Sequence, residues 1–191
     1  AREGTLARPD VTGHGDEAFG PERRSHSHFA RVLGAYGQDA TAGYSRAMRV
    51  GVMGAGAVGC FVGGLLADAG FEVVLVGRPR LFDELRAHGL TVADETASTT
   101  VPADALSLAT SPDALKGCDV VLVCTKSRQT EGVAREMKPH LAPDALVVSL
   151  QNGVRNPDRL RQALPQDVLP GIVEFNVVWS DNAHFQRTTR G

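Results

Sequence analysis

Residues Arg49 to Gly59 read RVGVMGAGAVG, and this stretch decides the fold. The apolar run over residues 50–53 predicts a buried strand, and it leads directly into three glycines with the spacing G-x-G-x-x-G. Apolar side chains then recur at helical spacing, which predicts a helix with one apolar face against a sheet and an end at Gly70. A strand, a glycine turn and a helix in this order are typical of the first unit of a dinucleotide-binding α/β fold.

The turn is predicted to hold a diphosphate through six residues: Gly54, Ala55, Gly56, Ala57, Val58 and Gly59. The first glycine permits the tight turn, the second lets the backbone approach the diphosphate, and the third lets the helix pack close to the strand. Free N–H groups and the positive end of the helix dipole favour an anion there. The alternative is a glycine-rich turn that binds nothing, in a chain that contains 21 glycines.

From residue 48 onward, β-rich apolar runs alternate with segments of helical period, which predicts β-α-β units. Further strands are expected at residues 72–76, 119–125, 146–150 and 171–175, and helices at 80–87, 127–140 and 157–164, with Ser127 as the cap of the second of these. We therefore expect a Rossmann-like doubly wound parallel sheet over residues 48–191.

Residues 1–47 have a different composition, with few large apolar side chains and no periodic order, and we expect a disordered extension. His14, His26 and His28 lie in this segment. No Cys, Asp or Glu stands at ligand spacing around them, so solvated loop histidines are favoured over a metal site.

Composition narrows the class of partner. The chain has 191 residues, of which 42% are hydrophobic and 22% charged, and its net charge of −2 favours neither nucleic acid nor an anionic membrane. The longest apolar runs are strand-sized, far below the ~20 residues of a membrane-spanning helix. Three cysteines, Cys60, Cys118 and Cys124, match no metal or disulfide pattern, which fits reduced structural cysteines and a cytoplasmic location.

The end of the second predicted strand indicates which nicotinamide cofactor is preferred. NAD sites usually place Asp or Glu about 20 residues after the glycines, to bond the ribose 2′-hydroxyl. This chain has Gly77-Arg78-Pro79-Arg80 there. The guanidinium of Arg78 can bind a 2′-phosphate, so NADP is favoured over NAD, whereas Arg80 is expected to be an ordinary solvated charge.

Two polar residues follow the next predicted strands, at the sheet edge where open α/β sheets bind ligands. Lys126 could contact the cofactor or polarise an incoming carbonyl, unless it simply extends into solvent. The side-chain amide of Asn152 can both donate and accept hydrogen bonds, unless Asn152-Gly153 is only a turn.

Four segments together resemble the ketopantoate reductase (2-dehydropantoate 2-reductase) family in order and spacing: residues 49–59, Gly77-Arg78, residues 123–129 (VCTKSRQ) and residues 151–154 (QNGV). The resemblance covers about residues 48–191. It implies NADPH-dependent reduction of 2-dehydropantoate to (R)-pantoate, a step of pantothenate and coenzyme A synthesis.

The resemblance also implies roles for single residues. Gly54 to Gly59 would hold the pyrophosphate, Arg78 the 2′-phosphate and Lys126 the cofactor near the site. Asn152 would contact both the nicotinamide ribose and the substrate, and a backbone contact to the nicotinamide would fall around residues 176–178. Family members carry a helical carboxyl-terminal domain with the proton-donating lysine, which we expect beyond Gly191, so no catalytic residue is assigned and the chain is expected to be a fragment with little activity.

Other functions stay open at this point. The chain could be a stand-alone NADP(H)-binding module without catalysis, or part of a reductase of another small 2-oxo acid. The resemblance could also extend only to the wider group of dehydrogenases with this nucleotide domain, such as those that act on hydroxy acids or sugar acids. Its oligomeric state is not indicated by the sequence.

Overall fold

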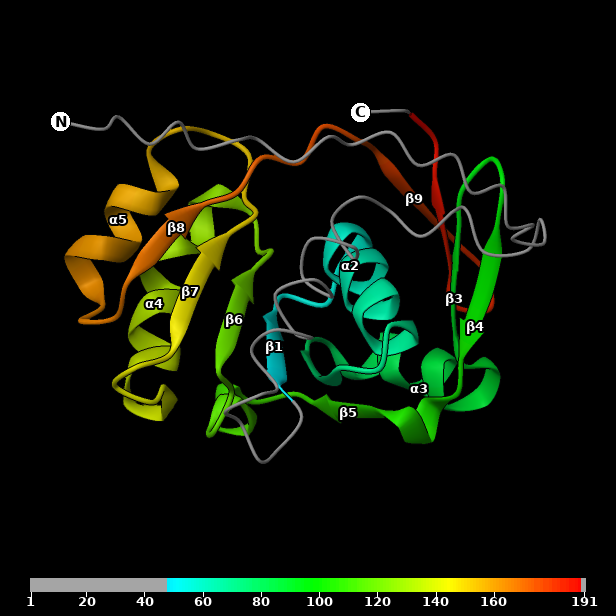
Figure 1. Cartoon of the computed structure of the whole chain (residues 1–191), viewed down its shortest axis with the longest axis horizontal. Coiled ribbons are helices and arrows are strands. Elements are labelled where there is room, and N and C mark those ends of the chain that lie inside the picture. Colours follow the sequence, from blue (N-terminus) through cyan, green and yellow to red (C-terminus); the bar gives the residue numbers. More distant parts are fainter. Residues whose placement is uncertain (1–47, 190–191) are drawn as a thin grey trace, which may run out of the picture.

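The computed structural model describes residues 48–189, so the predicted extension over residues 1–47, with its three histidines, lies outside the described residues. The described part forms a six-stranded sheet and a four-stranded sheet (Figure 1). The helix that follows the glycine turn contacts strands of both sheets.

The six-stranded sheet is parallel throughout and has the strand order β5-β2-β1-β6-β7-β8. Its strands are β1 (Arg49–Met53), β2 (Glu72–Val76), β5 (Leu106–Ala109), β6 (Val120–Val123), β7 (Leu146–Ser149) and β8 (Val168–Pro170). The chain starts at β1, builds the sheet outward on one side, and then returns to build the other side from β6. This is the strand order of doubly wound dinucleotide-binding folds, and the predicted Rossmann-like sheet is confirmed.

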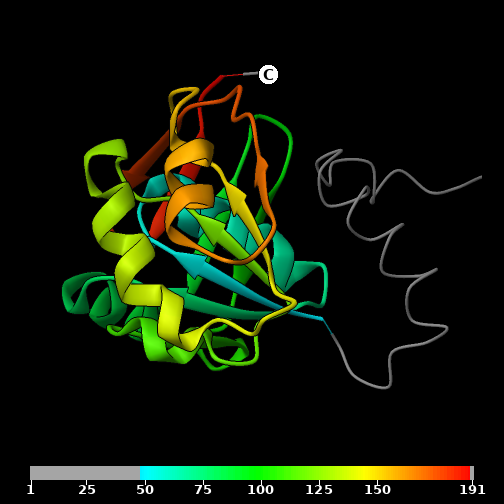
Figure 2. The ribbon, with the colours of Figure 1, turned by 90° about the vertical axis from the view of Figure 1, so that its left-hand side faces the viewer.

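Helices cover both faces of this sheet (Figure 2). One face packs against α2 (Ala57–Asp68) and α3 (Pro79–His88), and the other against α4 (Thr130–Met137) and α5 (Asn156–Ala163). Alternate side chains of each strand reach the two cores: Leu75 of β2 packs with α2 and α3, whereas its neighbour Val74 packs with the opposite core. Burial on both faces explains why these strands read as continuous apolar runs.

The four-stranded sheet was not predicted. It has the order β4-β3-β10-β9, with β3 (Leu90–Ala93), β4 (Ser98–Val101), β9 (Val177–Ser180) and β10 (His184–Arg187). β3 and β10 pair in parallel, with Thr91 opposite His184, although more than ninety residues separate them in sequence. Strands of only four residues carry little local signal, and no local sequence pattern marks a pairing between residues this far apart.

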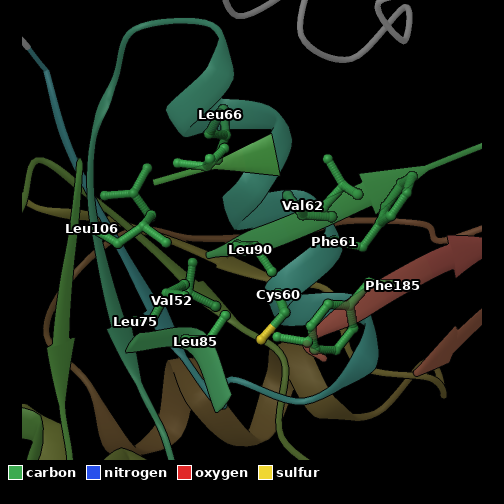
Figure 3. Close-up of a cluster of buried hydrophobic side chains, with 14 of the residues drawn as sticks. Val52, Cys60, Phe61, Val62, Leu66, Leu75, Leu85, Leu90, Leu106 and Phe185 are labelled. Atoms are coloured by element: carbon green, nitrogen blue, oxygen red, sulfur yellow. The ribbon is translucent and has the colours of Figure 1, made fainter. Parts of the chain in front are cut away.

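Helix α2 lies between the two sheets, so more than one of its sides is buried, whereas we predicted one apolar face. Figure 3 shows Cys60 and Phe61 of α2 close to Phe185 of β10, with Val52 and Leu75 of the large sheet in the same cluster. Seven of its residues are buried: Gly59, Cys60, Phe61, Val62, Gly63, Gly64 and Leu66. The small sheet supplies the second apolar surface that this helix needs.

The predicted strand at residues 171–175 is wrong. The sixth strand of the large sheet is β8, whose three residues pair with β7 from Val168 to Pro170. Residues 171–176 continue as an irregular segment in which half-buried and exposed side chains alternate. The alternation imitated a strand because Val173 and Phe175 pack against the core of α2, without any ladder of backbone hydrogen bonds.

The predicted helix at residues 127–140 is shorter and irregular at both ends. Its α-helical part is α4, flanked by single 3₁₀ turns at Ser127–Gln129 and Lys138–His140. The second turn contains Pro139, which has no N–H to continue the helix. The predicted capping role of Ser127 is also wrong, because its hydroxyl donates instead to the carbonyl oxygen of Asn152, at 2.7 Å.

The side chain of Asp94 bonds both to the turn between β3 and β4 and to Arg187 at the end of β10. Its carboxylate accepts hydrogen bonds from the backbone of Thr96 and Ala97, at 2.8 and 2.9 Å, and pairs with the Arg187 guanidinium at 3.0 Å. Burial acts to raise the pKa of Asp94. The hydrogen bonds from Thr96 and Ala97 and the charge of Arg187 outweigh it, so the pKa lies below its ordinary value of 3.8.

We expect the Asp94→Asn variant to be less sensitive to acid than the unsubstituted chain. A depressed folded-state pKa stabilises the fold above the unfolded-state value, and this stabilisation is lost as the pH falls through the folded-state pKa. Thermal unfolding followed by circular dichroism from about pH 6 to about pH 3 should give a flatter pH dependence in the variant. Asp83→Asn, at an exposed carboxylate on α3, is the control. Parallel pH curves for Asp94→Asn and the unsubstituted chain would contradict the assignment.

Candidate nucleotide-binding site

The four motifs singled out in the sequence lie at the carboxyl ends of four neighbouring strands. Arg78 follows β2, the glycine turn follows β1, Lys126 follows β6 and Asn152 follows β7, and these strands are adjacent in the order β2-β1-β6-β7. At a spacing of about 4.8 Å between strands, the four ends span roughly 14 Å of one sheet edge. The order reverses between β1 and β6, where open α/β sheets bind their ligands.

The glycine turn is fixed against the end of β2. The N–H groups of Gly54 and Ala55 both donate to the carbonyl oxygen of Val76, at 3.0 and 2.8 Å. Gly54 has a φ of +108°, and a β-carbon there would come within 2.8 Å of the Thr125 nitrogen. A β-carbon at Gly59 would collide with the carbonyl oxygen of Gly54. Close packing of turn, strand and helix therefore requires glycine at both positions.

Gly56 differs from these two glycines. It precedes the first residue of α2 with an ordinary φ of −109°, and a β-carbon there would meet nothing within 4 Å. The first N–H groups of α2 have no partner within the helix, and no side chain caps them. An open space in front of uncapped amides at a helix N-terminus fits a phosphate group, so the residues present fit the diphosphate of a dinucleotide.

Arg78 lies beside this turn, two residues after the Val76 carbonyl that holds it. Its side chain is exposed, and within residues 48–189 no ion pair or hydrogen bond engages its guanidinium. It does not line the cleft described next, which lies on the other side of β1. The arrangement thus separates a basic group near β2 from the polar groups near β6 and β7.

A cleft of about 410 Å³ opens over the ends of β6 and β7. Its lining comes from four segments: Val58 of α2, residues 124–127, residues 150–152 and residues 173–177. It therefore brings together Lys126, Asn152 and one residue of the glycine turn. Of the predicted backbone segment at residues 176–178, Asn176 and Val177 line the cleft and Val178 does not.

Lys126 and Asn152 present their side chains to this cleft without engaging each other. Both residues are exposed, and among the described residues neither the ammonium of Lys126 nor the side-chain amide of Asn152 has a hydrogen-bond partner. Such groups remain available to a ligand. The Asn152 carbonyl, by contrast, accepts hydrogen bonds from Ser127 and Asn156.

Sequence reasoning missed the polar side chains beneath the cleft. Gln151, Thr130 and Asn156 are buried and hydrogen-bonded to one another and to the loops after β6 and β7. Gln151 belongs to the QNGV segment that resembles the family, but the resemblance gives its side chain no role. Thr130 and Asn156 are 26 residues apart, and no local pattern marks them as partners.

An apolar wall closes the cleft beside Val58. Phe175 lines it and contacts the ring of Phe61 of α2, with ring centroids 5.4 Å apart. Cys124 also lines the cleft, and burial raises the pKa of its thiol to about 12. Cys124 is therefore a neutral wall residue near neutral pH, and Cys60, also buried, likewise has a raised pKa.

Residues 48–189 contain neither a candidate metal cluster nor a candidate membrane-spanning helix. No group of three or more His, Cys, Asp or Glu side chains in this range is placed to hold a metal ion. Nor does this range contain a helix with the length and apolar character needed to cross a membrane.

The chain is similar in sequence to 2-dehydropantoate 2-reductases and, at lower similarity, to glycerol-3-phosphate dehydrogenases. The chain is 36% identical over 123 residues to the 2-dehydropantoate 2-reductase of Halobacterium salinarum, which matches 64% of this chain and 40% of that protein. It is 29% identical over 130 residues to a glycerol-3-phosphate dehydrogenase (NAD(P)+) of Leptospira biflexa, over 65% of this chain and 38% of that one.

Solved structures agree with the sequence relatives. The crystal structure of a PanE/ApbA family ketopantoate reductase from Ralstonia eutropha JMP134 superposes with a TM-score of 0.70 and 43% identity, over 75% of this chain and 47% of that chain. The chain spans less than half the length of each of these three proteins. The family described as ketopantoate reductase PanE/ApbA matches residues 50–191, in agreement with the resemblance seen in the four motifs. The chain therefore belongs to the ketopantoate reductase family.

Proposed function

We propose that this chain is the NADP(H)-binding part of a 2-dehydropantoate 2-reductase, an enzyme that reduces 2-dehydropantoate to (R)-pantoate. One observation carries the proposal: the glycine turn, Arg78, Lys126 and Asn152 follow four adjacent parallel strands and meet at one sheet edge. The family membership supports the same activity.

Different residues of the site would bind different parts of the cofactor. The uncapped start of α2 and the open space at Gly56 would receive the diphosphate. Arg78, beside the turn, would bind the 2′-phosphate, where a carboxylate would repel it. Lys126 and Asn152 would then face the nicotinamide half from the cleft, and Asn152 would also contact the substrate.

When bound, NADPH supplies the hydride for a reduction of this class. The keto oxygen gains negative charge and must receive a proton as it does so. Lys126 lies in the cleft, but the family resemblance places the proton-donating lysine in the helical carboxyl-terminal domain of family members. The matched part of the relatives is less than half of their length. We therefore propose that the 191-residue chain binds the cofactor and turns over little substrate.

A reductase of another small substrate is the second candidate. It is favoured by the relatives named glycerol-3-phosphate dehydrogenase, which share the same part of the fold. The cleft residues named above do not by themselves select one oxo compound over another. Turnover assays that compare 2-dehydropantoate with other 2-oxo acids and with glycerol 3-phosphate would separate the two candidates.

Fluorescence titration of the 191-residue chain with NADPH tests the proposal directly. We expect saturable binding, competition by NADP, and weaker binding of NADH. With NADPH and 2-dehydropantoate together, consumption of NADPH should stay far below about 1 s⁻¹, the low end of ordinary enzyme rates. If neither NADPH nor NADH binds to the chain, the proposed function is rejected. Reduction at an ordinary enzyme rate would reject only the statement that turnover is low.

A further inference from the structure

Lys126 and Asn152 are the two side chains proposed to face the nicotinamide half of the cofactor, and they lie on separate loops. The first follows β6 and the second follows β7. Neither side chain has a hydrogen-bond partner within residues 48–189. Their separation must therefore be set by the backbone of the two loops and by whatever joins those loops.

Three side chains join them. The Ser127 hydroxyl donates to the carbonyl oxygen of Asn152 at 2.7 Å, Nε2 of Gln151 donates to the carbonyl oxygen of Thr125 at 3.0 Å, and Asn156 contacts both loops from below. Asn156, at the start of α5, is 3% exposed. Its Nδ2 donates to the hydroxyl of Ser127, at 2.9 Å, and to the carbonyl oxygen of Asn152, at 2.6 Å. Ser127 directly follows Lys126, so this single amide contacts the neighbour of one cleft residue and the backbone of the other.

The side-chain oxygen of Asn156 makes a second buried contact, which leads through Thr130 and Gln151 to Thr125. This Oδ1 atom lies 3.2 Å from the fully buried hydroxyl of Thr130. That hydroxyl also lies 2.8 Å from the carbonyl oxygen of Ser127, its nearer acceptor, and accepts a hydrogen bond from Nε2 of Gln151 at 3.0 Å. The same Nε2 donates to the carbonyl oxygen of Thr125, at 3.0 Å. The network thereby contacts Thr125 and Ser127, on either side of Lys126, and also Gln151, which precedes Asn152.

We propose that Asn156 is a positioning residue, which together with Ser127 and Gln151 sets the spacing of Lys126 and Asn152 and so the binding of the nicotinamide half of the cofactor. The inference rests on the proposed function. An amide is suited to this place because it donates two protons and accepts at its oxygen. A carboxylate of the same shape would face the Asn152 carbonyl with a second acceptor, and a hydrocarbon would remove the donor that the Asn152 carbonyl and the Ser127 hydroxyl share.

The proposal separates the two halves of the cofactor. Within residues 48–189, none of the hydrogen bonds of the Asn156 side chain reaches the glycine turn or Arg78, which are proposed to hold the diphosphate and the 2′-phosphate. Loss of these hydrogen bonds should therefore weaken the binding of the intact dinucleotide. The binding of a ligand that consists only of the adenosine end should stay unchanged. The nucleotide 2′,5′-ADP, which carries the 2′-phosphate and lacks nicotinamide, is such a ligand.

The test measures the Kd of NADPH and of 2′,5′-ADP for the full 191-residue chain and for Asn156→Ala. We expect the Kd of NADPH to rise about tenfold and that of 2′,5′-ADP to stay unchanged. The emission of bound NADPH should also shift toward that of the free nucleotide, because the nicotinamide is held less closely. Gln166→Ala is the matched control: Gln166 is likewise buried and donates to a backbone carbonyl, that of Ala142, but at the opposite sheet edge.

A second pair of variants covers the case in which Asn156→Ala does not fold. Thr130→Val removes the hydroxyl that lies between Asn156, Gln151 and the carbonyl oxygen of Ser127, and Thr130→Ser keeps it. We expect weaker NADPH binding in the first and nearly normal binding in the second.

The outcomes distinguish the inference from the proposed function. If the unsubstituted chain binds neither ligand, the proposed function fails and the inference fails with it. If it binds both, an equal loss of both ligands in Asn156→Ala, or no loss of either, overturns the positioning role alone. An equal effect of Gln166→Ala on NADPH would also overturn it, because any buried amide would then have the same effect.

Discussion

In the Gly56→Asp variant, nucleotide binding is expected to fall at least about 100-fold while the fold becomes slightly more stable. Gly56 has an ordinary φ and open space where its β-carbon would lie, so aspartate introduces no strain. Aspartate at a helix N-cap accepts a hydrogen bond from a free N–H and interacts favourably with the helix dipole, which adds about 0.5 to 1 kcal/mol. The same carboxylate occupies the place proposed for the diphosphate and repels it. NADPH titration and thermal unfolding of the same sample measure both effects.

Gly132→Asp is the control for this variant. Gly132 lies in the first turn of α4, and a β-carbon there would also meet nothing within 4 Å. It should gain similar stability and bind NADPH as the unsubstituted chain does. If Gly56→Asp keeps its affinity for NADPH, the start of α2 does not hold the diphosphate.

The part of the site that could be predicted is the part in which position follows from local sequence. A strand, a glycine turn and a helix fall within about 20 residues, and each signal depends only on near neighbours. Arg78, Lys126 and Asn152 each follow a strand closely. Because all strands of the large sheet run parallel, their ends had to meet at one edge, and the structure places them there.

The rest depends on contacts that local sequence does not encode. The small sheet exists because β3 pairs with β10, and its effect was to bury a second side of α2. The irregular segment after β8 alternates like a strand because its inner side chains pack against apolar neighbours. Asn156 reads as an ordinary residue at the start of a helix, and only the folded chain brings it to Ser127, 29 residues earlier.

Arg78→Ala is expected to weaken NADPH binding by roughly 10- to 100-fold and to leave NADH binding unchanged. The two nucleotides differ at the 2′-phosphate, and the guanidinium of Arg78 is exposed beside the glycine turn. A charge-assisted, two-pronged hydrogen bond to a phosphate is strong, and alanine cannot replace it. Titration with NADPH and with NADH in parallel gives both Kd values. The Kd of NADH divided by the Kd of NADPH should exceed one in the unsubstituted chain and fall toward one in the variant.

Arg80→Ala provides the comparison that makes the result specific. Arg80 is also exposed and lies two residues further on, in the first turn of α3, so its removal changes the net charge by the same amount. If the preference for NADPH came only from the general positive charge of this segment, both variants would lose it equally. Loss in Arg78→Ala alone would assign the preference to one side chain. Equal affinity of the unsubstituted chain for NADPH and NADH would remove the basis for an NADP site, although the diphosphate site at Gly56 would still stand on its own test.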